Sequence, residues 1–338
     1  MIAKIEGICM EIDFVLTWVD GSDPAWIKEL NKYTPNSKEI DISNERYRSW
    51  NNLQYWFRGI EKFAPWVNKI HFVTWGHVPK WLNTDHPKLN IIRHEDYMDK
   101  KSLPVFNSHP IEVNLHKIKG LSEQFVYFND DTFLTSPVSE TRFFKHGLPR
   151  DLAVIDVVSI GGIEHILVNN LRIINQYFSK KRQIKKNILK WLNPKYSLYN
   201  LKTTCLLPWK HFSGFFDPHQ AQSFLKSTFD DVWKHEIDVL EETSKSRFRK
   251  NTDVNQYLFR YWQLVTGNFM PVSIKDSKYV AIKTLADCLD TSELIIKQKY
   301  SLMCFNDKLD EDIDFEEAKR IINSALEKIL TQKSSYEI

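Results

Sequence analysis

The 338-residue sequence has little cysteine, little glycine and no long apolar run. Its four cysteines, Cys9, Cys205, Cys288 and Cys304, form no C-x-x-C pair and no Cys/His spacing typical of zinc. Four cysteines in so long a chain do not make a disulfide scaffold, so we interpret them as reduced thiols of a cytoplasmic protein. Ten glycines and 13 prolines exclude collagen-like and low-complexity structure. No stretch approaches the roughly 20 apolar residues that cross a bilayer, and residues 1–10 lack a secretory signal.

The overall charge is close to balanced, but its distribution is not. Lys and Arg number 46 and Asp and Glu 43, a net charge of +3 that argues against general nucleic-acid binding. Residues 165–216 contain no acidic residue and ten lysines or arginines. Such a stretch is most often a solvated helix face; a minority interpretation is peripheral contact of the 172–210 segment with a membrane surface or a polyanion. Aromatic residues make up 13%, including 11 Trp, which suits either carbohydrate or nucleotide stacking or a large core.

The first half of the chain alternates predicted strands and helices. Apolar, β-branched runs predict strands at 12–19, 69–74, 89–93 and 124–131, and three- and four-residue spacing of apolar side chains predicts helices at 50–63 and 111–118. This alternation predicts a mostly parallel sheet covered on both faces, with ligands at the carboxyl ends of its strands. Asp20, Asp23, Asp130 and Asp131 all fall at the carboxyl ends of predicted strands.

The second half is predicted to be largely helical. Asp217-Pro218, Asp253 and Asp314 each resemble a helix cap, the last with Glu317 as a capping box. The predicted helices lie at 171–192, at 221–225, at 254–262 and after Asp314. We therefore expect an α/β half at 11–150, a helical half at 151–310 packed on it, and a C-terminal amphipathic helix at 311–338.

Two acidic segments are candidates for chemistry. Adjacent carboxylates at Asp130 and Asp131, after a strand, favour Mg²⁺ or Mn²⁺ shared with substrate phosphates, because their repulsion needs a cation or several donors. The alternative is a solvated turn or a helix cap. The segment Asp20-Gly-Ser-Asp-Pro24 is most often a plain turn, and its alternative is a nucleotide or phosphate contact.

Isolated charged and histidine residues are weaker signals. Glu112 and His116 lie four residues apart, which most simply indicates a surface pair on a short helix. His211 alone would be a core or surface histidine. Arg46 and Arg249 would ordinarily be solvated or paired with acids.

Taken together, these segments resemble the Stealth family of sugar-phosphate transferases. The resemblance spans about residues 11–308, and its first two blocks are long and specific. The matching segments are Asp13-Phe-Val-Leu-Thr-Trp-Val-Asp-Gly-Ser-Asp-Pro24, 46–53, 58–67, 70–74, 78–83, 103–108, Phe125-Val-Tyr-Phe-Asn-Asp-Asp131, the surroundings of His211, Arg249-Lys-Asn-Thr-Asp253, and Cys304-Phe-Asn-Asp307.

The resemblance implies transfer of a hexose or N-acetylhexosamine 1-phosphate from a nucleotide-diphosphate sugar to a glycan hydroxyl. The products are a phosphodiester in a capsular or cell-surface polysaccharide and a nucleoside monophosphate. The implied donor is a UDP-sugar, the acceptor a glycan or lipid-linked glycan, and the cofactor Mg²⁺ or Mn²⁺. The implied fold is a Rossmann-like, mostly parallel sheet of the glycosyltransferase-A type.

The resemblance also implies roles for particular residues. Asp130 and Asp131 correspond to the acidic, metal-binding pair, and His211 to a histidine that we expect to be the general base. Here His211 precedes Phe212-Ser213-Gly214-Phe215 rather than the proline common in the family, which puts its local geometry in question. The remaining assignments are catalytic roles for Arg46, Arg249 and Asp253, and donor binding by Asp20, Gly21, Asp23 and Asn107.

Two other functions fit the same composition. A metal-dependent glycosyltransferase uses the same strand-to-acid architecture but moves the sugar without its phosphate, so its nucleotide product is a diphosphate. A non-catalytic glycan-binding protein would use the many Trp residues and would not depend on Asp130, Asp131 or His211.

Overall fold

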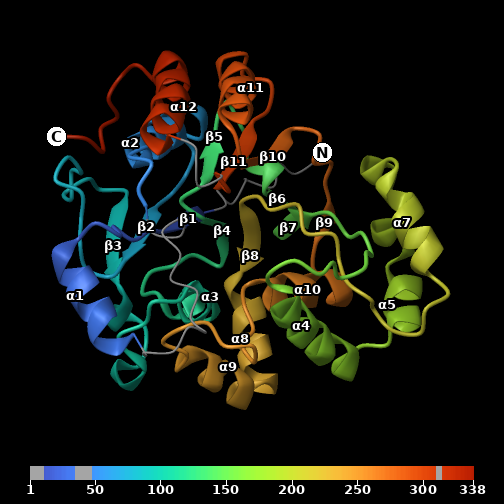
Figure 1. Ribbon diagram of the computed structural model, residues 1–338. Coiled ribbons are helices and arrows are strands. Elements are labelled where there is room, and N and C mark those ends of the chain that lie inside the picture. Colours follow the sequence, from blue (N-terminus) through green and yellow to red (C-terminus); the bar gives the residue numbers. More distant parts are fainter. Residues whose placement is uncertain (1–10, 35–47, 310–313) are drawn as a thin grey trace, which may run out of the picture.

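The computed structural model describes residues 11–34, 48–309 and 314–338, which fold around a central five-stranded sheet (Figure 1). The strand order is β3-β2-β1-β4-β8. The first four strands are parallel, and β8 pairs antiparallel with β4. Their bounds are β1 Ile12–Thr17, β2 Ile70–Thr74, β3 Leu89–Arg93, β4 Gln124–Phe128 and β8 Gln222–Leu225. The predicted α/β class with a mostly parallel sheet is confirmed.

Two smaller sheets join distant parts of the chain. The first has the order β10-β11-β5, with β11 parallel to β10 and antiparallel to β5; the second has the order β6-β7-β9. Their bounds are β10 Ser277–Ile282, β11 Leu302–Asp307, β5 Thr132–Leu134, β6 Phe144–Lys145, β7 Leu148–Asp151 and β9 Met270–Pro271. The proposed boundary at residue 150 falls within β7, and strands from both sides of it share all three sheets.

The helices are more numerous after residue 150, as expected. They are α1 Pro24–Tyr33, α2 Leu53–Phe63, α3 Ser108–Val113, α4 Glu164–Tyr177, α5 Lys180–Lys186, α6 Ile188–Trp191, α7 Tyr199–Leu206, α8 Lys226–His235, α9 Ile237–Ser244, α10 Tyr257–Thr266, α11 Leu285–Ile296 and α12 Phe315–Ile329. In Figure 1, α11 and α12 lie beyond the β10-β11-β5 sheet, α3, α8 and α9 lie at the opposite end, and α5 and α7 form the right-hand edge. No described helix is long and apolar enough to cross a membrane.

The core lies on both faces of the central sheet, because successive side chains of a strand point to opposite faces. Along β1, Phe14 and Leu16 enter one buried cluster, whereas Val15 enters another. The helix α2 buries Trp56 and Phe57 against the first of these clusters. Much of the aromatic content is therefore core.

Two predicted helix starts in the second half are wrong. Residues 222–225 form β8, not a helix, and α8 begins at Lys226. All four β8 residues are buried against β4 and α10, and the backbone N–H of Leu225 donates to Gln263 Oε1 at 2.9 Å. Pairing with β4 overrides the local cap signal of Asp217-Pro218. Asp253 caps no helix, because α10 begins only at Tyr257.

Candidate active site at the carboxyl edge of the sheet

The loop after β1 is held against the loop after β2. The Asp20 N–H donates to Nε2 of His77 at 2.7 Å, so the ring proton of a neutral His77 lies on Nδ1, which is 3.4 Å from Asp23 Oδ2. Burial lowers the pKa of His77, which keeps the ring neutral at pH 7. Asp23 also caps α1 by accepting from the Ala25 N–H at 2.7 Å. The predicted donor-binding loop, Gly21 included, is thus a fixed turn at the carboxyl edge.

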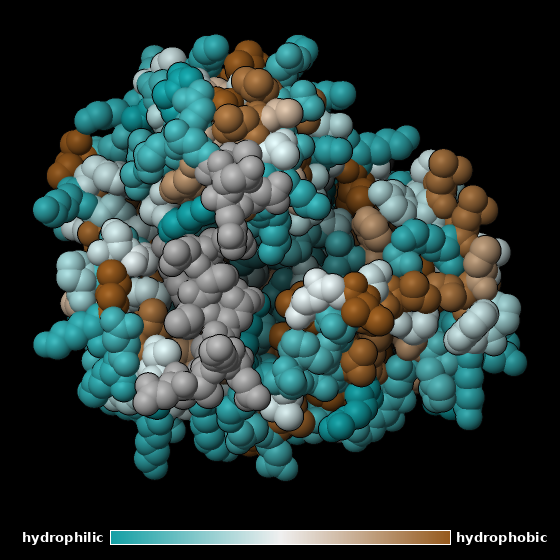
Figure 2. All heavy atoms as spheres, in the orientation of Figure 1, coloured by the Kyte–Doolittle hydropathy of each residue, from teal (hydrophilic) through white to brown (hydrophobic). Residues whose placement is uncertain are grey.

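Asp130 and Asp131 follow β4, the strand next to β1. Figure 2 shows this face of the molecule hollowed near its centre, over β4 and β8. The Asp130 side chain reaches solvent, yet the surrounding protein and, second, the charge of Asp131 raise the pKa of Asp130 to about 7. The negative charge of Asp131 therefore adds to the effect of desolvation on Asp130.

Asp131 meets two side chains that are distant in the sequence. The ligand atoms of Asp131, His219 and Cys304 all lie within 4.8 Å of one another. The backbone of Asp131 is fixed because its carbonyl accepts from the Phe305 N–H at 2.8 Å, and its Oδ2 accepts from Asn306 Nδ2 at 3.2 Å. The pairing of β5 with β11 brings these segments together.

His219 is the residue of this group that sequence reasoning missed. It lies in a loop before β8 with a φ of 47°, a left-handed conformation uncommon for a residue other than glycine. Its ring packs edge-on against Tyr279, with centroids 5.0 Å apart. The sequence interpretation took the preceding Asp217-Pro218 as a helix cap, and only the fold places His219 beside Asp131.

The donor set fits a divalent cation. A carboxylate suits Mg²⁺ and Mn²⁺, and the imidazole of His219 extends the preference to transition metals such as Mn²⁺. Burial and the charge of Asp131 raise the pKa of the Cys304 thiol, so it stays protonated and is a poor ligand. Asp131 and His219 are the residues that would hold the ion, with Asp130 beside them.

Glu112 and His116 are buried, so the predicted surface pair is wrong. Their exposed fractions are 6% and 7%. Glu112 Oε2 accepts from the Gln256 N–H at 3.2 Å, and its Oε1 lies 3.5 Å from the hydroxyl of Tyr127 on β4. The Tyr127 hydroxyl also lies 3.1 Å from Thr17 Oγ1 at the end of β1. This polar group therefore joins β1 and β4 to the start of α10.

Asn107 and Asp253 form a second buried polar group. Asp253 Oδ2 lies 3.0 Å from Asn107 Nδ2, 3.1 Å from His109 Nδ1 and 3.0 Å from the Lys250 backbone nitrogen. Burial alone would raise the pKa of Asp253, but the hydrogen bonds of His109, Ser246 and Lys250 hold it below its usual value. Asn107 caps α3 as well. These residues fix the 246–253 loop, in which Arg249 is exposed.

The other predicted residues lie elsewhere. His211 is exposed after α7, and the neighbouring Phe212 is held by hydrogen bonds to Asn175 of α4. Among the described residues, no hydrogen bond or ion pair joins His211 to Asp130 or Asp131. Arg46 lies outside the described residues.

Comparison with known proteins identifies related chains of nearly the same length. The model of Stealth protein conserved region 1 matches residues 10–38 and that of conserved region 2 matches residues 46–151. Capsular polysaccharide phosphotransferase WcwK of Streptococcus pneumoniae is 44% identical, over 97% of this chain and 98% of that protein. Exopolysaccharide phosphotransferase cps2G of Lactiplantibacillus plantarum is 37% identical, over 97% and 96% of the two chains.

Among solved structures, the galactosyltransferase LgtC with donor and acceptor sugar analogs matches with a TM-score of 0.39 and 9% identity, over 96% of this chain and 98% of that one. The sequence matches run through both halves of the chain, and the two conserved regions contain the Asp20 loop and the Asp130-Asp131 pair. This protein belongs to the Stealth family.

Proposed function

We propose that this protein transfers a sugar 1-phosphate from a nucleotide-diphosphate sugar to a hydroxyl of a glycan acceptor during synthesis of a capsular or other cell-surface polysaccharide. The relatives above, named as phosphotransferases of such polysaccharides, support the reaction class. We propose a UDP-sugar as donor, a glycan or lipid-linked glycan as acceptor, and the cytoplasm as location.

One observation carries the proposal. Asp131, which follows β4, and His219, which precedes β8, converge at the carboxyl edge of the sheet. The neighbouring strand β1 leads into the Asp20 loop at the same edge. Ligands of parallel α/β sheets bind at this edge. A donor pyrophosphate bound there would lie between the loop after β1 and the acidic pair after β4.

Phosphoryl transfer depends mainly on alignment of the reacting groups and on offsetting phosphate charge. A bound Mg²⁺ or Mn²⁺ supplies positive charge for the donor phosphates. In the proposal, Asp131 and His219 hold that ion, the Asp20–Asp23 loop positions the nucleotide side, and Arg249 contributes a planar set of donors for phosphate oxygens. Asp253 and Asn107 act indirectly, since both hold the loop that carries Arg249.

The catalytic histidine has two candidates. Sequence reasoning named His211 as the general base, whereas His219 lies beside Asp131, where we propose that it is a metal ligand. His219→Ala should lower turnover by roughly 10²–10⁴-fold through loss of that ligand. His211→Ala is the comparison: if it lowers turnover and His219→Ala does not, the role returns to His211.

The reaction itself is tested by identifying the nucleotide product. The protein is incubated with a panel of nucleotide sugars, glycan acceptors and Mn²⁺ or Mg²⁺, and products are followed by phosphorus NMR. A nucleoside monophosphate together with a new phosphodiester is expected. A nucleoside diphosphate would instead establish a glycosyltransferase.

The role of Asp131 is tested by replacing it. Asp131→Asn should reduce the rate by about 100-fold or more, because the variant loses a metal ligand. The matched control is Asp238→Asn, at an exposed residue of α9.

A further inference from the structure

Part of the acid-free stretch, from α5 to α7, lies at one edge of the molecule. We define the α5–α7 surface as the exposed residues of α5, α6, α7 and the turn at 207–210. In Figure 1 these helices form the right-hand edge, and Figure 2 shows hydrophobic residues gathered over α7 there.

The lysines and arginines of this surface fall into two groups. Some are engaged: Lys180 Nζ donates to the carbonyls of Leu206 and Trp209, and Lys202 pairs with Asp156. Others are exposed and form no ion pair with a described residue. This second group is Lys181, Arg182, Lys185, Lys186 and Lys210. The surface thus carries an excess of positive charge that the rest of the described chain does not neutralise.

Large apolar side chains are exposed between these cations. Leu189 is 79% exposed, Leu198 78%, Leu201 62% and Trp209 61%. Several of the most exposed large apolar residues of the described chain therefore lie within about 20 positions of one another. Isolated exposed leucines need no explanation, but a group of them on one surface indicates an interaction site.

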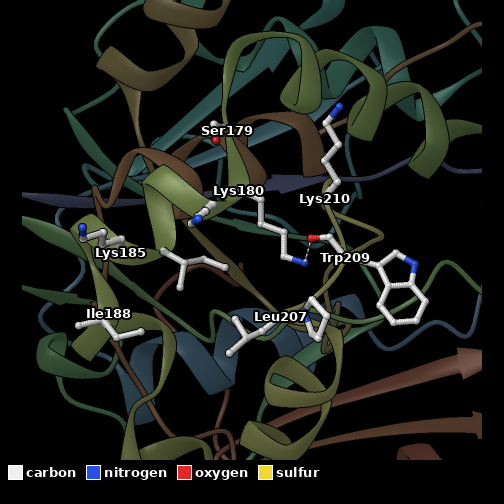
Figure 3. Close-up of a pocket in the computed structure, with 10 residues that line it drawn as sticks. Ser179, Lys180, Lys185, Ile188, Leu207, Trp209 and Lys210 are labelled. Atoms are coloured by element: carbon white, nitrogen blue, oxygen red, sulfur yellow. Dashed lines mark hydrogen bonds between the residues drawn. The ribbon is translucent and has the colours of Figure 1, made fainter.

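A hollow of about 740 Å³ opens in the same surface, between α5 and the 207–210 turn (Figure 3). Ile184, Ile188 and Leu207 provide apolar walls, and Lys181 and Lys185 also line it. The hydrogen bond from Lys180 to the Trp209 carbonyl, 2.9 Å long and drawn in Figure 3, holds the turn against α5. The hollow is therefore built from fixed elements.

We propose that the α5–α7 surface docks this protein on an anionic lipid bilayer. The cations face the negative headgroups, and the exposed leucines and Trp209 enter the boundary between headgroups and acyl chains, as in other interfacial helices. Charge complementarity alone would also suit a soluble polyanion. The apolar side chains decide between the two, because an anionic polysaccharide in water gives Leu189 and Leu198 nothing apolar to contact. The inference does not depend on the proposed reaction.

Flotation of the full-length protein with vesicles tests the proposal. Binding is expected to vesicles of phosphatidylglycerol and phosphatidylcholine, to weaken at high salt, and to be much weaker with phosphatidylcholine alone. The triple variant Lys181→Gln/Lys185→Gln/Lys186→Gln should bind on the order of 10- to 100-fold more weakly. Leu189→Ser/Leu198→Ser/Leu201→Ser should lose binding by a comparable factor.

The matched control is Ile237→Ser/Leu289→Ser/Ile296→Ser, which removes exposed apolar side chains on α9 and α11 and should bind as the parent does. A second measurement uses the exposed Cys205 of α7, with Cys9 replaced by Ser, as the attachment point for a polarity-sensitive fluorophore. Its emission should shift to the blue on anionic vesicles. Equal binding to both vesicle types, no binding at all, or full binding by the leucine variant would each overturn the proposal, the last in favour of a soluble polyanion.

Discussion

At the scale of single residues, burial sets the ionisation of several histidines. Burial lowers the pKa of His94 to about 4 and that of His116 to about 3, and the nearby Lys117 and Lys226 contribute to the second shift. His116 packs against Phe229 and Trp233 of α8, with ring centroids 5.7 and 5.6 Å away. An unfolded chain would protonate these rings near pH 6.5, whereas the folded protein keeps them neutral.

Acid is therefore expected to destabilise the protein between pH 6.5 and about 4. In that window the unfolded state binds more protons than the folded state, so the free energy of unfolding falls as pH falls. Each such histidine should lower the free energy of unfolding by about 2 kcal/mol when the pH is lowered from 8 to 5. His116→Phe keeps the ring packing and should reduce the difference in urea-unfolding free energy between these pH values by about that amount.

The control for this prediction is His235→Phe, because the His235 side chain is 43% exposed and its replacement removes no buried histidine. A His116→Phe variant with the parent's pH difference would show that His116 is protonated in the folded protein.

At the scale of elements, Asp314 and Asp253 were both predicted to cap a helix, but the structure gives them different roles. Asp314 caps α12 by accepting from the backbone N–H groups of Glu316 and Glu317, as the sequence predicted, and it lies at the surface. Asp253 is 1% exposed and is bound by groups from α3 and from its own loop. The two residues are distinguished only by their tertiary contacts: Asp314 stays a helix cap, whereas Asp253 becomes a buried acceptor of several hydrogen bonds.

Replacing these two residues should therefore have unequal effects. Asp253→Ala leaves buried donors of Asn107, His109 and Lys250 without an acceptor, and should lower the free energy of unfolding by about 3 kcal/mol or more. Asp314→Ala, the matched control, removes an exposed cap and should cost about 1 kcal/mol. Urea denaturation at about pH 7.5 measures both losses in unfolding free energy, because the buried histidines affect stability only at lower pH. Equal losses would contradict the role of Asp253 in holding the 246–253 loop.

At the scale of the whole molecule, the C-terminal helix is part of the core. Ile322, Leu326 and Tyr336 are each at most 4% exposed and pack with residues of α2. Arg58 of α2 adds a 2.8 Å ion pair with Glu337 and a 2.9 Å hydrogen bond to the Leu330 carbonyl. The amphipathic helix predicted within 311–338 is α12, and together with the residues that follow it α12 packs against α2.

A chain that ends at residue 313 should consequently fail to fold. Removing several fully buried side chains forfeits on the order of 10 kcal/mol, comparable with the total stability of a typical domain. Circular dichroism and thermal melts of the truncated chain should show no cooperative transition. A chain ending at residue 337 is the control, since Ile338 is 73% exposed. A parent-like melt of the shorter chain would show that the helix is separable.

The sequence by itself determined the elements whose signals are local. Apolar runs predicted β1, β2, β3 and β4 to within three residues at each end. Three of these strands, β1, β2 and β4, are buried on both faces and therefore form continuous apolar segments in the sequence. Acids after strand ends located the Asp20 loop and Asp130-Asp131, because parallel strands end at one edge.

Only the tertiary structure decided which distant residues join that edge. His219 reaches Asp131 through the pairing of β4 with β8 and of β5 with β11, contacts that span the chain and leave no periodic signal in it. The pairing of β8 with β4 makes residues 222–225 a strand. Other long-range contacts, with Tyr127, Phe229 and Asn107 respectively, surround Glu112, His116 and Asp253. Local sequence fixes backbone preference and charge, whereas burial and proximity depend on contacts that form only when the whole chain packs.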